Sequence, residues 1–338
     1  MAIYIGLLVI HLLCVKFCNK ILLLISFILL FLVMGFRDIN LGTDALNYQL
    51  MFNISSEGYS LDIEPLWYLL NRSVFLMGGD YESLLIISSI LTLTPVYIAA
   101  CLADKRRVFI IIFLYISLYY YCYAFNIIRQ SIGMSFGILG LVLLNDKDKS
   151  NHKYFWLCLV IGGGFHSIIY SLIILKFIPR LFEKVNNIVV LQIVTFFIGL
   201  FFHNYLLTFL SRFFYSKYID FEGGNLLGNL IYLVILNCVF IAISQVITLK
   251  NNWYYYMSFF VLVSNLFIRF PFGARFILLF GIIQIVFLPF LLKNNKLNTK
   301  YKSVILIAIL TYGLINFFRI LGAGEIVPYK GYFFNFII

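Results

Sequence analysis

The sequence predicts an all-α, polytopic integral membrane protein, and its composition carries that prediction. Of its 338 residues, 63% are hydrophobic and 12% are charged, and the mean hydropathy is +0.99. A water-soluble fold cannot bury so much apolar surface. With 22 Gly and 6 Pro, the chain is also unlike a disordered or fibrous protein. We therefore expect a single transmembrane domain over residues 1–338, with about 10 to 12 transmembrane helices.

Ten apolar stretches are long enough to span a bilayer, which takes about 20 apolar residues in a helix. They cover residues 2–18, 20–36, 83–103, 108–124, 126–145, 188–206, 229–249, 253–270, 274–292 and 303–321. Six cysteines fall inside apolar runs without metal-ligand spacing, so we interpret them as packing residues. His11, His152 and His203 are likewise interpreted as structural.

Two further apolar segments are ambiguous as spans. Residues 65–79 are interrupted by Asn71 and Arg72, and residues 154–178 are broken by three glycines at 162–164. Basic loops favour the cytoplasmic side of a membrane. This rule makes the first segment a non-spanning partial helix on the outer face. It makes the second a re-entrant hairpin that reverses at its glycines, because glycine tolerates such a turn.

The same rule orients the loops of the chain. It places the N-terminus outside, residues 146–153 inside, and the polar segments 37–82 and 207–228 on the outer face, the former including the partial helix. The net charge of +11 then reflects positive cytoplasmic loops, and no nucleic-acid partner is expected.

Arginine is distributed differently from lysine in this topology. Most lysines lie inside, whereas most arginines lie near the outer ends of spans: Arg37, Arg72, Arg129, Arg212, Arg269, Arg275 and Arg319. The planar guanidinium binds phosphate through two parallel hydrogen bonds and stays charged. The cluster therefore indicates a phosphorylated lipid head group. The simpler alternative is that each arginine snorkels or pairs with an outer acid.

Several polar residues follow the second span and open the partial helix. Asp44 and Tyr48 are four residues apart and would share a helix face, with Gly42 allowing a tight turn before them. Glu64 and Pro65 stand where a helix start favours a carboxylate and a proline. Capping is therefore the simpler interpretation of Glu64.

A resemblance rests on these residues. The string GFRDINLGTDALNYQLMF, Glu64-Pro65, Arg129-Gln130, a glycine run leading to His166, an arginine before the penultimate span and Pro328-Tyr329 together resemble the EpsG family. That family belongs with the Wzy-type O-antigen and exopolysaccharide polymerases.

The resemblance implies a GT-C-like glycan polymerase in the bacterial inner (cytoplasmic) membrane. Such an enzyme takes repeat units carried on undecaprenyl pyrophosphate at the outer face. It transfers the growing chain from its lipid carrier to a new lipid-linked unit. Membrane lipid and a chain-length regulator protein are the further partners that it implies, and no cofactor is expected.

The implied chemistry needs a base for the acceptor hydroxyl and cations for the departing pyrophosphate. The candidate bases are His166, Asp44 and Glu64. The candidate binding residues are Arg37, Arg129, Arg269, Arg275, Arg319, Tyr48, Gln130 and Tyr329. We expect Arg129 and Arg275 to converge with Arg37 or His166 around one outer-face cavity. Gly133, Gly137 and Gly140 follow Arg129 and should let its helix pack closely against a neighbour.

No metal site is expected. Asp146-Lys147-Asp148 has the DxD spacing of many glycosyltransferases, but it lies among lysines in a predicted cytoplasmic loop. Two other functions stay open. A lipid-linked oligosaccharide flippase or transporter would also use intramembrane arginines, and a membrane glycan acyltransferase could use one histidine with several arginines.

Overall fold

The computed structural model describes residues 1–15, 19–58, 63–105, 107–202, 205, 226–246, 251–270, 273–293, 299–321 and 325–331, and these are helical with no strand of a sheet among them. The chain divides into two compact units, Met1–Tyr170 with Leu288–Ile338, and Ser171–Phe287. We call them the first and the second unit. Whether the two units form one transmembrane domain, as expected from the sequence, stays a prediction.

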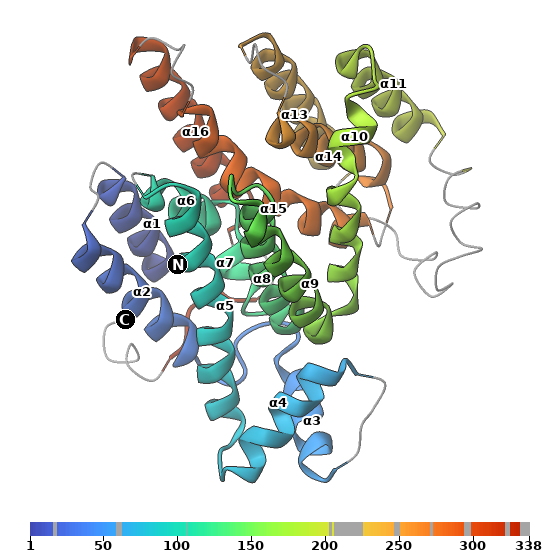
Figure 1. Ribbon diagram of the computed structural model, residues 1–338. Coiled ribbons are helices and arrows are strands. Elements are labelled where there is room, and N and C mark those ends of the chain that lie inside the picture. Colours follow the sequence, from blue (N-terminus) through green and yellow to red (C-terminus); the bar gives the residue numbers. More distant parts are fainter. Residues whose placement is uncertain are drawn as a thin grey trace. The chain divides into compact units, whose positions relative to one another are not determined.

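The first unit contains most of the helices (Figure 1). They are α1 (Ala2–Cys14), α2 (Lys20–Gly35), α3 (Ala45–Ser56), α4 (Pro65–Leu76), α5 (Tyr81–Ala103), α6 (Val108–Ser117), α7 (Tyr120–Tyr123), α8 (Ile128–Leu144), the 3₁₀ turn η1 (Lys149–Asn151), α9 (His152–Phe165) and α16 (Thr299–Ile320). The second unit holds α10 (Ile178–Phe182), α11 (Ile188–Phe201), α13 (Leu226–Val246) and α14 (Asn252–Phe267). The 3₁₀ segment η2 (Ser167–Lys176) and α15 (Gly273–Leu291) run from one unit into the other.

Each of the ten predicted spans coincides with helix in the described residues, which makes this an all-α membrane protein. Three helices are long and apolar enough to cross a bilayer: Tyr81–Ala103, Gly273–Leu291 and Tyr301–Ile320. Seven shorter apolar helical segments of 10–17 residues lie in the part of the chain that the structure describes, among them Leu230–Ser244 of α13. The number of spans and the GT-C-like architecture therefore stay predictions.

The predicted span 108–124 is wrong as one continuous helix. Tyr119 has φ 73°, a left-handed conformation that L-residues rarely adopt, and it separates α6 from α7. The Tyr119 ring is fully buried against Tyr123 and Phe317. The helix therefore breaks at Tyr119, where the ring is buried, and the hydropathy of the segment gives no sign of this break.

The predicted hairpin at 154–178 has its turn at a different residue from the one expected. Gly162 to Gly164 stay inside α9, and His166 breaks the helix with φ −156° and ψ 117°. Ile169 then packs onto Gly162, and a Cβ on Gly163 would overlap the Tyr170 ring. The expectation that the glycines form the turn is wrong, because they supply space for the returning chain instead.

Helices α8 and α9 lie side by side with their backbones in close approach (Figure 1). A Cβ on Gly133 would come 2.9 Å from the carbonyl oxygen of Gly162, and one on Gly140 would come 3.1 Å from the Cβ of Cys158. The predicted small-residue face of α8 is thus confirmed at these two glycines. It holds the start of α8 firmly against the end of α9.

Polar side chains tie the remaining helices of each unit together. In the first unit, Ser26 on α2 hydrogen-bonds both His11 on α1 and Tyr97 on α5. In the second unit, Gln192 on α11 donates to the carbonyl oxygen of Ser258, and Asn265 contacts α11 and α13. Such interhelical bonds satisfy polar groups that apolar surroundings cannot. The structural interpretation of His11 is confirmed by these contacts, whereas His203 lies outside the described residues.

Candidate functional site

The segment after α2 is docked between two distant parts of the first unit. Arg37 forms a backbone bridge with Gly331, and the Asp38 N–H donates to the Lys330 carbonyl at 2.9 Å. Further on, the Thr43 N–H donates to Asn126 Oδ1 at 2.8 Å. Gly42 has φ 111°, and a Cβ there would overlap the Asn126 side chain. Glycine is therefore required at this turn both for its conformation and for the close approach.

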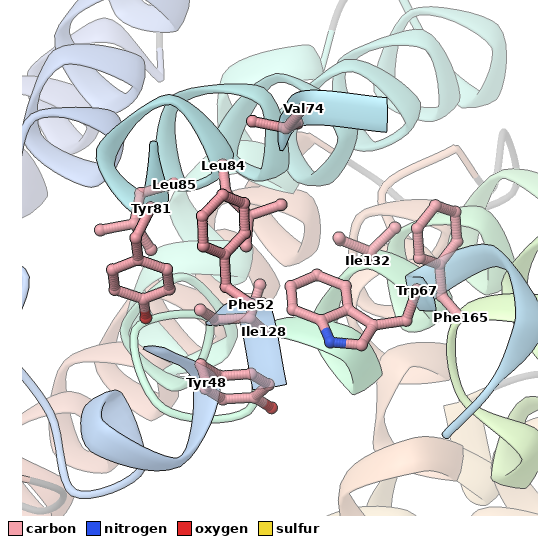
Figure 2. Close-up of a cluster of buried hydrophobic side chains, with 10 residues drawn as sticks. All are labelled: Tyr48, Phe52, Trp67, Val74, Tyr81, Leu84, Leu85, Ile128, Ile132 and Phe165. Carbon is pink, nitrogen blue, oxygen red and sulfur yellow. The ribbon is translucent and has the colours of Figure 1, made fainter. Parts of the chain in front are cut away.

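Helices α3, α4, α5, α8 and α9 share a cluster of buried hydrophobic side chains (Figure 2). It comprises Tyr48, Phe52, Trp67, Val74, Tyr81, Leu84, Leu85, Ile128, Ile132 and Phe165, from α3, α4, α5, α8 and α9. Three of these residues stand one to three positions from polar candidates in sequence. Trp67 follows Glu64, Ile128 precedes Arg129, and Phe165 precedes His166. Burial of the cluster consequently brings those three polar residues to one place.

Glu64 is the centre of the resulting polar group. Its Oε2 forms an ion pair with Arg129 Nη1, its Oε1 accepts from the Ser167 N–H at 3.3 Å, and His166 Nδ1 lies 3.8 Å from Oε1. The Glu64 and Arg129 side chains are 16% and 19% exposed, so the pair is partly open to solvent. Glu64 occupies the N-cap position of α4, with Pro65 as the first helical residue, as expected, but its side chain makes no capping bond to α4. The carboxylate instead joins the start of α8 to the turn after α9.

His166 contributes an imidazole at that turn. The Ile168 N–H donates to His166 Nδ1 at 3.4 Å. When Nδ1 accepts this bond, the neutral ring carries its proton on Nε2. The Nε2–H is then a donor, while Glu64 lies on the Nδ1 side of the ring.

Tyr48 and Asp44 extend the group along α3. The Arg129 guanidinium lies 6.0 Å from the centre of the Tyr48 ring, a cation–π arrangement. Burial raises the pKa of Tyr48, and the nearby Arg129 charge opposes that rise. Asp44 occupies the N-cap position of α3 without a side-chain capping bond, and its backbone carbonyl accepts from the Tyr48 N–H at 3.1 Å. The expected one-turn spacing of Asp44 and Tyr48 is confirmed.

Gln130 and Arg129 also present buried donors. Among the described residues, Arg129 Nε and Gln130 Nε2 have no hydrogen-bond partner. Buried donors normally find a partner, so such groups commonly mark a place where a ligand or water binds. Both residues are at the start of α8, where Arg129 pairs with Glu64.

Arg37 occupies a second and different environment. The residue is 4% exposed, and its guanidinium stacks on the Phe125 ring with 4.8 Å between the Arg37 Cζ and the ring centre. The neighbouring Asp38 carboxylate accepts from the Asn40 N–H at 2.8 Å. Tyr329 joins this environment. Burial raises the pKa of Tyr329 to about 12, with the Arg37 charge opposing the rise.

Tyr329 also fixes the C-terminal segment. Its hydroxyl donates to the Val33 carbonyl at 2.9 Å, and Tyr4 similarly donates to the Ile326 carbonyl at 3.0 Å. Arg37 and Tyr329 thus come together around the attachment of residues 325–331. The other group consists of Arg129, Glu64, His166 and Tyr48, and Gln130 follows Arg129 in sequence.

The remaining arginine candidates lie elsewhere in the chain. Arg319 donates to Asn316 at the end of α16 at 3.3 Å. Arg269 and Arg275 belong to the second unit, where Arg269 donates to the Leu200 carbonyl near the end of α11 at 2.8 Å. A cation at helix-end carbonyls is a common structural arrangement. A pyrophosphate-binding role for these three stays a prediction.

The carboxylates of the DxD sequence, Asp146 and Asp148, accept hydrogen bonds from residues of the same turn. Asp146 accepts from Asn151 at 2.8 Å, and Asp148 accepts from the Ser150 N–H at 2.9 Å. The bond from Asn151 lowers the pKa of the Asp146 carboxyl.

Two contributors to the site were missed from sequence. Asn126 holds the Gly42 turn, and the Trp67 ring packs edge to face with the Tyr48 ring. Asn126 had a recognisable signal, since an amide within an otherwise apolar stretch three residues before Arg129 needs a partner. The role of Trp67 depends on contacts between distant helices, with no local signal.

Comparison with known proteins gives one family. No curated protein and no solved structure matches the chain. The model of the EpsG family matches residues 20–331, a range that contains Arg37, the Gly42 turn, Glu64, Arg129, His166 and Tyr329. Since the match covers nearly the whole chain, this all-helical membrane protein belongs to the EpsG family, which supports a place in polysaccharide biosynthesis.

Proposed function

We propose that this protein is a polysaccharide polymerase of the Wzy type, a glycosyltransferase acting on undecaprenyl-pyrophosphate-linked repeat units at the outer face of the bacterial inner membrane. The observation that carries the proposal is the partly exposed group of Glu64, Arg129 and His166, which three separate helix ends bring together in a member of the EpsG family. A carboxylate, a guanidinium and an imidazole supply the proton acceptor and the anion donors that such a transfer needs.

The ion pair suggests an order of events. Arg129 pairs with Glu64 in the structure. A pyrophosphate offers several oxygens in the geometry that a guanidinium prefers, so it competes with the carboxylate for Arg129. Binding of the lipid-linked donor therefore releases Glu64 to act as a base. Arg129 Nε, buried without a partner among the described residues, is a further donor for the anion.

The transfer then balances as one displacement. The acceptor hydroxyl oxygen forms a bond to the anomeric carbon of the growing chain, and the bond from that carbon to the pyrophosphate oxygen breaks. The hydroxyl proton passes to Glu64. The undecaprenyl pyrophosphate leaves as an anion beside Arg129, and the His166 Nε2–H donates to it. Asp44, close to Tyr48, and His166 remain the alternative bases.

Arg129→Lys tests the proposal. Lysine keeps the positive charge beside Glu64 but lacks the two parallel donors, so we expect single lipid-linked units to persist while long polymer disappears. The measurement is glycan chain length on a gel, beside the membrane level of the protein. Arg72→Lys is the matched control, because Arg72 donates to the Ser56 carbonyl on α3 and should keep long chains.

Normal chain lengths from Arg129→Lys would contradict the proposal. Failure of lipid-linked units to reach the outer face in the same variant would instead favour the flippase alternative. A chain-length regulator remains a proposed partner, and co-purification from membranes tests it.

A further inference from the structure

The helical pair α3 and α4 is apolar on two opposite faces. Tyr48 and Phe52 on α3, like Trp67 and Val74 on α4, point into the buried cluster. The other face carries large apolar side chains as well. These are Leu46, Leu50, Leu69, Leu76 and Met77, each between 56% and 74% exposed, and we call them the α3–α4 leucine face.

Helical spacing shows that the exposed leucines form continuous stripes. Leu46 and Leu50 are four residues apart on α3, and Leu69 and Leu76 are seven apart on α4, so each pair shares a helix face. Apolar area left in water is unfavourable in proportion to its size. A contiguous exposed apolar face on a structured segment therefore indicates something that covers it.

The pair cannot cover this face by spanning a membrane. Each helix has 12 residues. At a rise of 1.5 Å per residue such a helix is roughly 18 Å long, well short of the ~30 Å hydrocarbon core.

Continuity with α5 indicates what lies on the face. Helices α3 and α4 lie beside the start of α5 (Figure 1), and Met77 is four residues before Tyr81, where this candidate membrane span begins. The surface of α5 exposes Ile90, Ile98 and Leu102, as a lipid-facing helix does. The start of the span therefore brings Leu76 and Met77 to the edge of the bilayer.

Polar groups near the pair fit the same boundary. Asp80 caps α5 by accepting from the Ser83 N–H at 2.9 Å. Arg72 lies over the Phe75 ring, with 5.7 Å from its Cζ to the ring centre, and donates to Ser56. A cation on an aromatic ring beside exposed leucines is typical of the lipid–water interface. On α3, Asn53 and Glu57 are exposed beyond the two leucines.

We propose that the α3–α4 leucine face lies in the lipid–water boundary of the membrane, covered by the hydrocarbon of the bilayer lipids, as an interfacial amphipathic hairpin. Because Glu64 directly precedes α4, this contact holds the Glu64–Arg129 pair at the depth of the lipid head groups. The inference concerns membrane contact and holds whichever reaction the site performs.

Spin-label accessibility tests the proposal in the full chain, without substrate, in nanodiscs of phosphatidylethanolamine and phosphatidylglycerol. Leu69→Cys and Leu76→Cys are labelled after Cys14, Cys18, Cys101 and Cys238 are replaced by serine, while the buried Cys122 and Cys158 stay. We expect both labels to collide several-fold more often with oxygen than with a water-soluble nickel chelate. Ile98→Cys is the lipid-facing control, and Lys149→Cys, at an exposed position in the η1 turn, is the aqueous one.

Nickel collisions at Leu69 and Leu76 as frequent as at Lys149 would overturn the proposal. Shielding from both probes would also overturn it, since another protein surface would then cover the face. Leu76→Trp in a chain with all native cysteines gives a second measurement. Its fluorescence should be quenched several-fold more by lipids brominated on the acyl chains than by iodide in the buffer, and the reverse order would refute the proposal.

Discussion

Arg37 and Arg129 were both predicted from the sequence to bind pyrophosphate, and the structure gives them different surroundings. Arg129 is partly exposed and pairs with Glu64 at the meeting point of three helix ends. Arg37 is buried and stacks on the Phe125 ring, with the phenols of Tyr4, Tyr81, Tyr121 and Tyr329 in its surroundings. The comparison teaches that an arginine suited to pyrophosphate by type can serve the fold instead, and that access and partners separate the two uses.

The sharpest way to break this comparison is to remove the buried cation. Arg37→Ala would leave a void against Phe125, and a desolvated cation–π contact alone is worth about 2 kcal/mol. We expect most of the protein to disappear from the membrane and the remainder to melt at lower temperature in detergent. Arg129→Lys is the comparison variant and should accumulate normally. An Arg37→Ala protein that accumulates fully yet makes no polymer would show that Arg37 acts on substrate.

His166 lies on the Arg129 side of the comparison, and His166→Asn separates catalysis from structure there. Asparagine can still accept the Ile168 N–H and so keep the turn, but it lacks the imidazole. General acid or base groups contribute about 10²- to 10⁴-fold to rate. We expect polymer formation to fall by that order at an unchanged protein level. The check is polymer yield over time, normalised to protein; long chains at the normal rate would remove His166 from the site.

Gly42 tests whether the motif loop positions the site from a distance. Gly42→Ala places a Cβ against Asn126 at a left-handed φ, which costs more than about 1 kcal/mol. We expect a lower melting temperature and shorter glycan chains, because α3 and Tyr48 follow this turn. Gly6→Ala is the matched control, since nothing lies within 4 Å of a Cβ at Gly6. Equal melting temperatures for the two variants would contradict the close packing at Gly42.

The smallest expected effect concerns Tyr329 and alkaline pH. Its pKa rises from 10.0 to about 12 in the folded protein, so the neutral phenol is favoured by folding. The corresponding stability is present below pH 10.0 and is lost as the pH rises towards 12. Melting temperatures between pH 8 and pH 11 should therefore fall less in Tyr329→Phe than in the native chain. The difference in the free energy of unfolding should correspond to about one pKa unit. Identical pH profiles would place the alkaline loss at other tyrosines.

Much of the fold could be predicted from composition and local pattern. The ten predicted spans coincide with helix because a run of apolar residues in lipid must satisfy its backbone internally, and a helix does so within the segment. The close packing of α8 on α9 was also predictable, since glycines at 133 and 140 leave room for a neighbour wherever that neighbour comes from. These properties depend on residues near one another in sequence.

Tertiary structure decided what each polar residue does. Glu64 read as a helix cap, and it became the partner of Arg129 because burial of Trp67, Ile128 and Phe165 gathers their neighbours. The hairpin turns at His166, after the glycines, because Ile169 and Tyr170 pack against Gly162 and Gly163. Arg37 is enclosed because residues 325–331 pack across it. In each case the deciding contact joins segments far apart in the chain, and the energy of packing such segments is absent from any local pattern.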